Sequence, residues 1–240
     1  MLKISLLDDG TRSEPIALRA WAGMAAVDLL EHDESAGAML LQRLDGDHTL
    51  ESVPDIDAAC SVIGTLLTSV TAPAGIPLLE VEVQRIADAI VEHRATHPGL
   101  LPVAVVDRAV ATLRDLVQQL GSGTRRELVH GNCHFLNVLH TVPTEDAAWV
   151  AIDPLPSAGL REWDVTALLR NRWEDAVATG DPDAALRRRV DLVSEIVGMD
   201  TSQVRTIAQA VAVDNLLWLL PRDPHDKFVA PYRVMSSWRT

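Results

Sequence analysis

The chain has 240 residues, of which 48% are hydrophobic and 23% are charged, enough for one large or two small domains with a buried core. This composition excludes the disordered and fibrous classes. The 34 Asp and Glu residues outnumber the 21 Lys and Arg residues, and the resulting net charge of −13 disfavours nucleic acid as a partner.

The first fifty residues predict a small sheet with one helix on it. In residues 1–7, MLKISLL, apolar and polar side chains alternate as they do in a strand with one buried face. A helix is expected over residues 14–23, with Pro15 in its first turn. Two apolar runs, residues 25–33 and 37–45, are separated by a short turn that ends in glycine, which indicates a hairpin.

From Pro54 onward the apolar residues recur every three or four positions, which is typical of helices. The expected helices are, in chain order, 55–70, 78–95, 102–120, 161–171, 183–197 and 201–220. Between the third and fourth helices, residues 128–140 and 148–153 predict short strands joined by a Pro-Thr-Glu-Asp turn. The tail after Pro221 is expected to be irregular.

We expect two parts in the chain, because the hydrophobic period changes near residue 50. The Asp- and Gly-rich segment Leu44–His48 is the natural hinge. Residues 1–47 would form a β-rich N-terminal lobe, and residues 48–240 a larger helical lobe. No internal repeat is visible in the sequence.

The cysteine content and the N-terminal sequence indicate the cellular compartment of the protein. Cys60 and Cys133 are too few for a disulfide framework, so we expect free thiols in a reducing compartment. The N-terminus lacks the apolar stretch of a signal peptide. No apolar run reaches the roughly 18 residues that a membrane span needs, because Asp214 interrupts the longest one. We therefore expect a cytoplasmic protein without a membrane partner.

The side chains that carry chemistry gather in HGNCHFLNVL, residues 130–139, and at the end of the following strand. Asn137 in this loop and Asp153 just after that strand supply hard oxygen ligands, which suit Mg²⁺ and its phosphate partners. Lys3 on the first strand and Glu14 on the next helix form a second pair. Kinase-like folds use such a pair to hold the lysine against the α and β phosphates of ATP.

The loop resembles the H-G-D-x-H-x-x-N loop of aminoglycoside phosphotransferases, and VAIDP followed by REWDVTALLRN resembles their streptomycin and hydroxyurea phosphotransferase branch. The resemblance extends over most of the chain. It implies an α+β, protein-kinase-like fold with two lobes, a small N-terminal sheet lobe and a larger helical one. It also implies an ATP- and Mg²⁺-dependent kinase that phosphorylates a hydroxyl group of a small molecule, such as a cationic aminocyclitol.

The resemblance further implies a role for each matching residue. Lys3 would contact the phosphates, and Glu14 would orient Lys3. Asn137 and Asp153 would hold Mg²⁺, and Asp164 would brace the catalytic loop.

One departure from the family's pattern lies in the loop itself. Where the family has the Asp that accepts the substrate's hydroxyl proton, this chain has Asn132, whose neutral carboxamide can position a hydroxyl but cannot take its proton. A general base contributes on the order of 10² to 10⁴ in rate, so we expect impaired transfer. His130, at the start of the loop, is interpreted as a structural histidine.

A second departure lies at the start of the chain. Kinase-like folds place a Gly-rich loop and two strands before the lysine strand, whereas only Met1 and Leu2 precede Lys3. We therefore expect an incomplete lobe, weak ATP binding, and an unpaired strand edge that could form a homodimer with a second copy. A gene product that begins upstream of Met1 is the other explanation.

Two functions remain open on the sequence. One is an impaired small-molecule O-phosphotransferase of the streptomycin or hydroxyurea type. The other is a catalytically inactive kinase-like protein that acts as a binding or assembly module. Asn132 and the missing Gly-rich loop are the features that favour the second.

Other conspicuous residues are given structural interpretations. His93 and His97 stand four apart, but a zincin has Glu where this chain has Arg94, so no zinc site is expected. Nothing near Cys133 in the sequence would lower its thiol pKa enough to make it reactive. Three tryptophans are expected to pack in the core or between the lobes, one of them conceivably against an acceptor: Trp163, Trp173 and Trp218.

Overall fold

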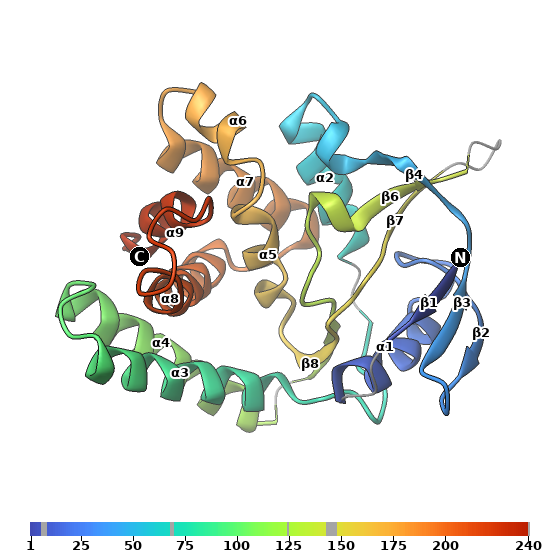
Figure 1. The fold of residues 1–240 in the computed structure, drawn as a ribbon, viewed down its shortest axis with the longest axis horizontal. Helices are drawn as coiled ribbons and strands as arrows, with labels where there is room; N and C mark the ends of the chain where they lie inside the picture. Colours follow the sequence, from blue (N-terminus) through green and yellow to red (C-terminus); the bar gives the residue numbers. More distant parts are fainter. Residues whose placement is uncertain (6–8, 68–69, 124, 143–147, 240) are drawn as a thin grey trace.

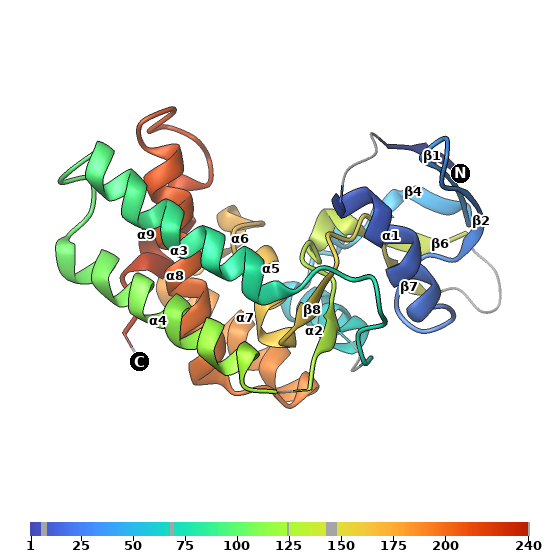
Figure 2. The same cartoon turned by 90° about the horizontal axis from the view of Figure 1, so that it is seen from below.

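The computed structural model describes residues 1–5, 9–67, 70–123, 125–142 and 148–239. A small body of strands with one helix carries the N-terminus, and a larger helical body carries the C-terminus at the opposite end (Figures 1 and 2). Short strands connect the two bodies. The segments that carry the predicted site, around residues 130–139 and 153, lie in this connection.

The first sheet is antiparallel, with strand order β1-β3-β2. Its strands are β1 (Leu2–Ile4), β2 (Leu29–Asp33) and β3 (Ala38–Leu41). The register places Lys3 opposite Met39, and the predicted hairpin of β2 and β3 is confirmed. Its turn is stabilised by the Asp33 carboxylate, which accepts hydrogen bonds from backbone N–H groups two and three residues on.

Helix α1 covers this sheet, but its bounds differ from those expected. It spans Asp9–Ala20, so Pro15 lies inside the helix instead of in its first turn. The helix ends before Gly23 because the chain turns there with a positive φ of 70°, a conformation that glycine adopts without steric cost. Ala17 and Leu18 face the small core beneath the sheet.

The second sheet joins distant parts of the chain, in the order β4-β6-β7. Its strands are β4 (Leu44–Thr49), β6 (Val138–Thr141) and β7 (Trp149–Ala151). Residues 44–48 were expected to form an irregular hinge. The structure differs, because pairing with β6 organises these Asp- and Gly-rich residues into a strand. The lobe boundary between residues 47 and 48 stays a prediction. The expected Pro-Thr-Glu-Asp turn lies outside the described residues.

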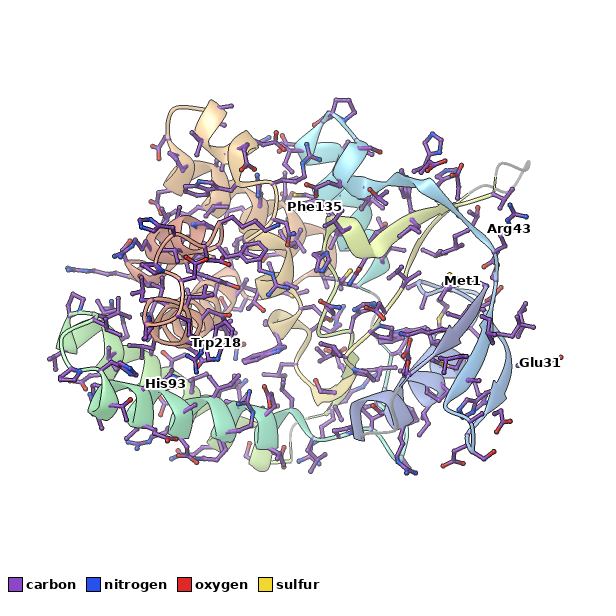
Figure 3. The ribbon with its side chains drawn as sticks, in the orientation of Figure 1. Met1, Glu31, Arg43, His93, Phe135 and Trp218 are labelled. Carbon is purple, nitrogen blue, oxygen red and sulfur yellow. The ribbon has the colours of Figure 1, made fainter. Side chains whose placement is uncertain are left out.

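A two-stranded ladder supports the loop between the sheets. Strands β5 (Glu127–Val129) and β8 (Ser157–Gly159) pair antiparallel on either side of it. The predicted strand over 128–140 is therefore two strands, β5 and β6, separated by a loop that ends in a 3-10 helix, η2 (Phe135–Asn137). Phe135 is completely buried (Figure 3), so it anchors the loop in the helical core.

The helical body confirms most of the expected helices. They are α2 (Ile56–Leu66), α3 (Leu79–Thr96), α4 (Val103–Gly121), α5 (Val165–Leu169), α7 (Pro182–Val197) and α8 (Thr201–Leu219), with 3-10 turns η1 (Leu50–Ser52) and η3 (Arg161–Trp163). Helix α8 is central, because one core cluster joins it to α2, α7 and the C-terminal helix α9 (Val229–Ser236), and another joins it to α3 and α4. No helix in the described ranges is long and apolar enough to cross a bilayer.

Two helices were not expected: α6 (Trp173–Ala178) and α9 (Val229–Ser236). The prediction of an irregular tail was wrong, because Val229, Tyr232 and Met235 recur at three-residue spacing and bury one face of α9. The prediction for Trp218 was also wrong. This side chain is 49% exposed and projects from α8 (Figure 3) beneath the guanidinium of Arg222, 4.6 Å from the ring centroid.

Candidate functional site

The Lys3 ammonium lies between two carboxylates. Its Nζ donates to both oxygens of Glu14, at 2.7 and 2.8 Å, and to Oδ1 of Asp153 at 2.5 Å. The Glu14 side chain is almost fully buried, whereas that of Asp153 is 54% exposed. Strand β1, helix α1 and the segment after β7 thus meet at one cation, although Lys3 and Asp153 are 150 residues apart.

The pKa values reflect this arrangement. Partial burial pulls the pKa of Lys3 down, but hydrogen bonds to Asp153 and Glu14 outweigh it, so the pKa lies above its ordinary value. Burial raises the pKa of Glu14, and the contact with Lys3 opposes that rise. Lys3 therefore stays protonated at neutral pH, and its ammonium is held with one carboxylate on the protein side and one facing solvent.

Asp153 has an unusual backbone conformation. Its φ is 58°, in the left-handed region, where residues other than glycine are uncommon and Asn and Asp are the most tolerant. The Nδ2 group of Asn132 donates to the Asp153 carbonyl oxygen at 3.1 Å. One residue earlier, the Ile152 N–H donates to the carbonyl oxygen of Asn137 at 2.8 Å. The loop thus holds the turn that presents the carboxylate.

The Asn137 side chain is bonded to the same loop. Its Nδ2 donates to the Asn132 carbonyl oxygen at 3.1 Å, which leaves Oδ1 as the atom that could bind a cation. An amide oxygen from Asn137 and a carboxylate from Asp153 fit the oxygen ligands that Mg²⁺ takes, with the remaining positions filled by water and substrate phosphates. Among the described residues, no group of three or more His, Cys, Asp or Glu side chains could hold a metal ion.

Asp164 is bonded to the start of the loop. Its buried carboxylate accepts from the N–H of Gly131 at 2.6 Å and from the N–H of His130 at 3.1 Å. Burial raises the pKa of Asp164 to about 7, although both N–H groups act to lower it. Burial also lowers the pKa of His130 to about 3, so this histidine is neutral. Its Nδ1 accepts from the Asn132 N–H at 3.3 Å.

The loop requires glycine at one position. Gly131 has a φ of 73°, and a Cβ there would lie 2.3 Å from the carbonyl oxygen of Leu155. The Cys133 thiol, two residues further on, is inert, because burial raises its pKa well above its ordinary range. The seven residues that the sequence places in the site belong to one connected set of hydrogen bonds: Lys3, Glu14, His130, Asn132, Asn137, Asp153 and Asp164.

Sequence reasoning missed His134. Its pKa is lowered to about 4, mainly by burial and also by the charge of Arg170, while the charge of Asp153 acts in the opposite direction. The charges of Arg170 and Asp153 therefore both act on the His134 ring. The second histidine of the loop motif, together with the arginine that ends TALLR, was the signal in the sequence.

Comparisons with known proteins place these features in a family. Residues 1–221 match the model of the aminoglycoside/hydroxyurea antibiotic resistance kinases. The chain is 35% identical over 221 residues to streptomycin 6-kinase of Streptomyces glaucescens, covering 91% of this chain and 70% of that protein. It is 32% identical over 222 residues to hydroxyurea phosphotransferase of Kitasatospora aureofaciens, covering 90% and 61%.

Solved structures share the fold. A choline/ethanolamine kinase family protein from Mesorhizobium loti superimposes with a TM-score of 0.61 at 16% identity, over 98% of this chain and 79% of that one. The ADP-bound aminoglycoside phosphotransferase APH(2'')-Ib gives a TM-score of 0.53 at 10% identity, over 98% and 85%. The expected two-lobed, protein-kinase-like α+β fold is confirmed.

Proposed function

The chain belongs to the aminoglycoside/hydroxyurea antibiotic resistance kinase family, and we propose that it transfers the γ-phosphoryl group of ATP to a hydroxyl group of a small molecule, at a reduced rate. The observation that carries this proposal is the position of Lys3 between Glu14 and Asp153. Relatives named for streptomycin and for hydroxyurea make these two compounds the first acceptors to test.

Lys3 and Glu14 form the phosphate-binding half of the site. Because its ammonium has three donor hydrogens, Lys3 can turn from Asp153 to phosphate oxygens while Glu14 keeps it in place. The buried position of Glu14 limits the directions that Lys3 can take. This pair therefore orients the nucleotide phosphates toward the loop.

Asn137 and Asp153 form the metal-binding half. When Mg²⁺ is bound, it supplies positive charge that offsets the phosphate oxygens. Asn137 would bind it through Oδ1, because its Nδ2 is already bonded to the loop. Asp153 would bind it through its exposed carboxylate, and the ion pair between Asp153 and Lys3 would then break.

Asn132 limits the rate of phosphoryl transfer in this proposal. Its Nδ2 is bonded to Asp153, so Oδ1 can accept a hydrogen bond from the acceptor hydroxyl and align its oxygen for attack. A carboxamide does not take the proton, which instead leaves to a phosphate oxygen or to water. Phosphoryl transfer through a loose transition state depends mostly on positioning and charge, so the reaction is slowed, not abolished.

The test is a product assay. Wild-type protein and Asn132→Asp are incubated with Mg·ATP and either streptomycin or hydroxyurea, and phosphorylated acceptor is detected by ³¹P NMR and mass spectrometry. We expect slow product formation by the wild type and faster formation by the variant. If both proteins bind Mg·ATP and neither phosphorylates either acceptor, the proposal is wrong.

Asn132 also favours a second candidate function, a catalytically inactive binding or assembly module. Strand β1 is an outer strand of its sheet among the described residues, and Leu2 and Ile4 on it are 64% and 70% exposed, so this edge could pair with a second copy. Calorimetry with Mg·ATP and sedimentation of the protein separate the two candidates. A dimer that does not bind Mg·ATP would support the module, whereas a monomer with turnover would contradict it.

A further inference from the structure

The side chain of Trp21 packs against the imidazole ring of His130. The two ring centroids lie 5.7 Å apart, and the ring planes are inclined by 31°. Both residues are buried, with exposed fractions of 3% and 4%. Trp21 directly follows α1, whereas His130 begins the loop after β5, so this contact joins the small N-terminal body to the loop of the site.

Backbone hydrogen bonds fix the position of Trp21. Its N–H donates to the carbonyl oxygen of Ala17 at 3.0 Å, so Trp21 extends the last turn of α1. Further on, the carbonyl oxygen of Ala25 accepts from the Ala151 N–H at 2.8 Å, and the Val27 N–H donates to the Ala151 carbonyl oxygen at 2.9 Å. These bonds tie the chain after α1 to β7. None of them uses the indole ring, so the backbone at position 21 stays in place when the side chain is changed.

His130 connects this contact to the transfer site. Its Nδ1 accepts from the Asn132 N–H at 3.3 Å, a bond that forms only while the ring keeps this nitrogen turned toward residue 132. Asn132 in turn donates from Nδ2 to the Asp153 carbonyl oxygen at 3.1 Å. A continuous chain of contacts therefore runs from Trp21 through His130 to Asn132 and the turn at Asp153.

A small cavity borders both rings. Its wall also contains Ala25 and Ala151, whose side chains are single methyl groups, and the space suffices for about one water molecule. Because empty space adjoins the His130 ring, the contact with Trp21 is needed to keep the ring in one orientation. A smaller side chain at position 21 would enlarge the cavity and leave the ring free to turn.

We propose that Trp21 is a positioning residue for phosphoryl transfer, because it holds His130 in the orientation that places Asn132 for the acceptor hydroxyl. The inference rests on the proposed phosphotransferase function and adds a residue to it. In this scheme Trp21 acts through His130 and contacts no substrate. The hydrogen bonds between Lys3 and Glu14 do not involve it. The loss of the indole ring therefore slows the transfer step and leaves ATP binding intact.

Steady-state kinetics with Mg·ATP and the better acceptor are the first test. Trp21→Leu removes the ring contact, and Trp21→Phe keeps an aromatic ring at the same position. We expect kcat to fall by about tenfold in Trp21→Leu and by about threefold or less in Trp21→Phe, with the KM for ATP unchanged in both. His130→Asn retains an acceptor for the Asn132 N–H but lacks the ring. It should lose as much kcat as Trp21→Leu, and it replaces that variant if the latter does not fold.

Trp149→Leu is the matched control. Trp149 also packs against a histidine, His140, with ring centroids 4.9 Å apart. The Nδ1 of His140 is bonded to the carbonyl oxygen of Thr141 and not to an N–H of the loop. We expect Trp149→Leu to keep the wild-type kcat and KM.

A double-mutant cycle separates positioning from a loss of folded protein. Asn132→Asp is introduced into the wild type and into Trp21→Leu, and the gain in kcat is compared. A smaller folded fraction lowers both members of a pair equally and leaves the gain unchanged. If Trp21 positions residue 132, the gain in the Trp21→Leu background should be smaller by about tenfold. Equal gains in the two backgrounds would overturn the proposal.

Amide hydrogen exchange gives a second measurement that needs no turnover. Peptides that cover residues 130–137 should exchange about tenfold faster in Trp21→Leu than in the wild type, whereas peptides from α7 and α8 should not change. Trp149→Leu should match the wild type in the loop. Unchanged exchange of the loop in Trp21→Leu would overturn the role of Trp21. If no protein in the set turns over either acceptor, the proposed function fails, and the exchange rates still decide whether Trp21 orders the loop.

Discussion

Asn132 donates a hydrogen bond from Nδ2 to the backbone carbonyl oxygen of Asp153 over 3.1 Å. The contact holds Asp153 in place, whose φ of 58° is uncommon for residues other than glycine. A carboxylate at position 132 has no N–H to make this bond, and its oxygens would repel the carbonyl. The carboxamide therefore holds the turn at Asp153, the proposed metal-binding turn, in a way that a carboxylate at position 132 would not.

The variant Asn132→Asp tests directly whether position 132 limits the rate of transfer. The variant gains a general base, which is worth on the order of 10² to 10⁴ in rate, and loses the bond to Asp153, so we expect kcat to rise by about 10². Steady-state kinetics with Mg·ATP and the better acceptor measure the change. Asn132→Leu has neither base nor amide and should be slower than the wild type. Equal kcat for Asn132 and Asp at this position would contradict the assignment.

Lys3→Met should weaken nucleotide binding and slow the transfer. The phosphate oxygens lose their cationic partner, so we expect the KM for ATP to rise by about tenfold and kcat to fall by about 10². The buried Glu14 also loses its partner, which costs on the order of 2 kcal/mol in unfolding free energy. The double variant Lys3→Met/Glu14→Gln should recover the stability but not the activity. Arg85→Met, which removes an exposed cation paired with Glu82, is the control.

Asp153→Asn should weaken metal binding without disturbing the backbone, because Asn tolerates the left-handed conformation as well as Asp does. The site loses its charged ligand, so the Mg²⁺ concentration for half-maximal activity should rise by about tenfold or more. Titration of Mg²⁺ into chelator-treated protein measures this shift. Asp107→Asn, at an exposed ion pair with Arg94, should leave the titration unchanged. An unshifted curve for Asp153→Asn would remove Asp153 from the metal site.

Gly131→Ala should destabilise the loop. The added Cβ would lie 2.3 Å from the Leu155 carbonyl oxygen, and φ is 73°, so both the backbone and its neighbour must shift. We expect a loss of about 2–4 kcal/mol in unfolding free energy, measured by urea denaturation. Gly46→Ala is the matched control, because nothing lies within 4 Å of its Cβ position. Comparable losses in the two variants would contradict the tight contact at Gly131.

Asp214 predicts a pH dependence of stability. Its pKa is raised to about 6, mainly by burial. The charge of Arg85 opposes this rise, and the charge of Glu82 adds to it. The native state therefore holds this proton more tightly than the unfolded state. The contribution of Asp214 to unfolding free energy falls as pH rises from about 4 to about 6, and the loss is complete above that range.

Replacing Asp214 with Asn removes this loss. We expect Tm to rise by about 2–4 °C at pH 8, which corresponds to about 1 kcal/mol in a chain of this size, and not to rise at pH 4. Thermal melts at the two pH values measure the difference. The exposed Asp88→Asn should show no gain at either pH. A gain of equal size at both pH values would mean that Asp214 acts through packing, not through its charge.

Much of the site could be predicted because its residues come in short local patterns. The H-G-x-x-H-x-x-N spacing and the Asp after a strand identify a loop and a strand end, and a lysine strand followed by a helix with Glu identifies their partners. The hydrogen bond from Asn132 to the Asp153 carbonyl oxygen belongs to no such pattern, because it joins two residues that are 21 positions apart in the chain.

The periodicity of apolar residues determined the positions of the long helices by itself, since each of them buries one face along its own length. The residue types of the loop likewise determined which chemistry the chain could carry. Tertiary structure alone decided that residues 44–49 pair with β6 and that Asn132 bonds to Asp153. These contacts join segments that are distant in the chain. The residue pattern of one segment does not specify which other segment packs against it.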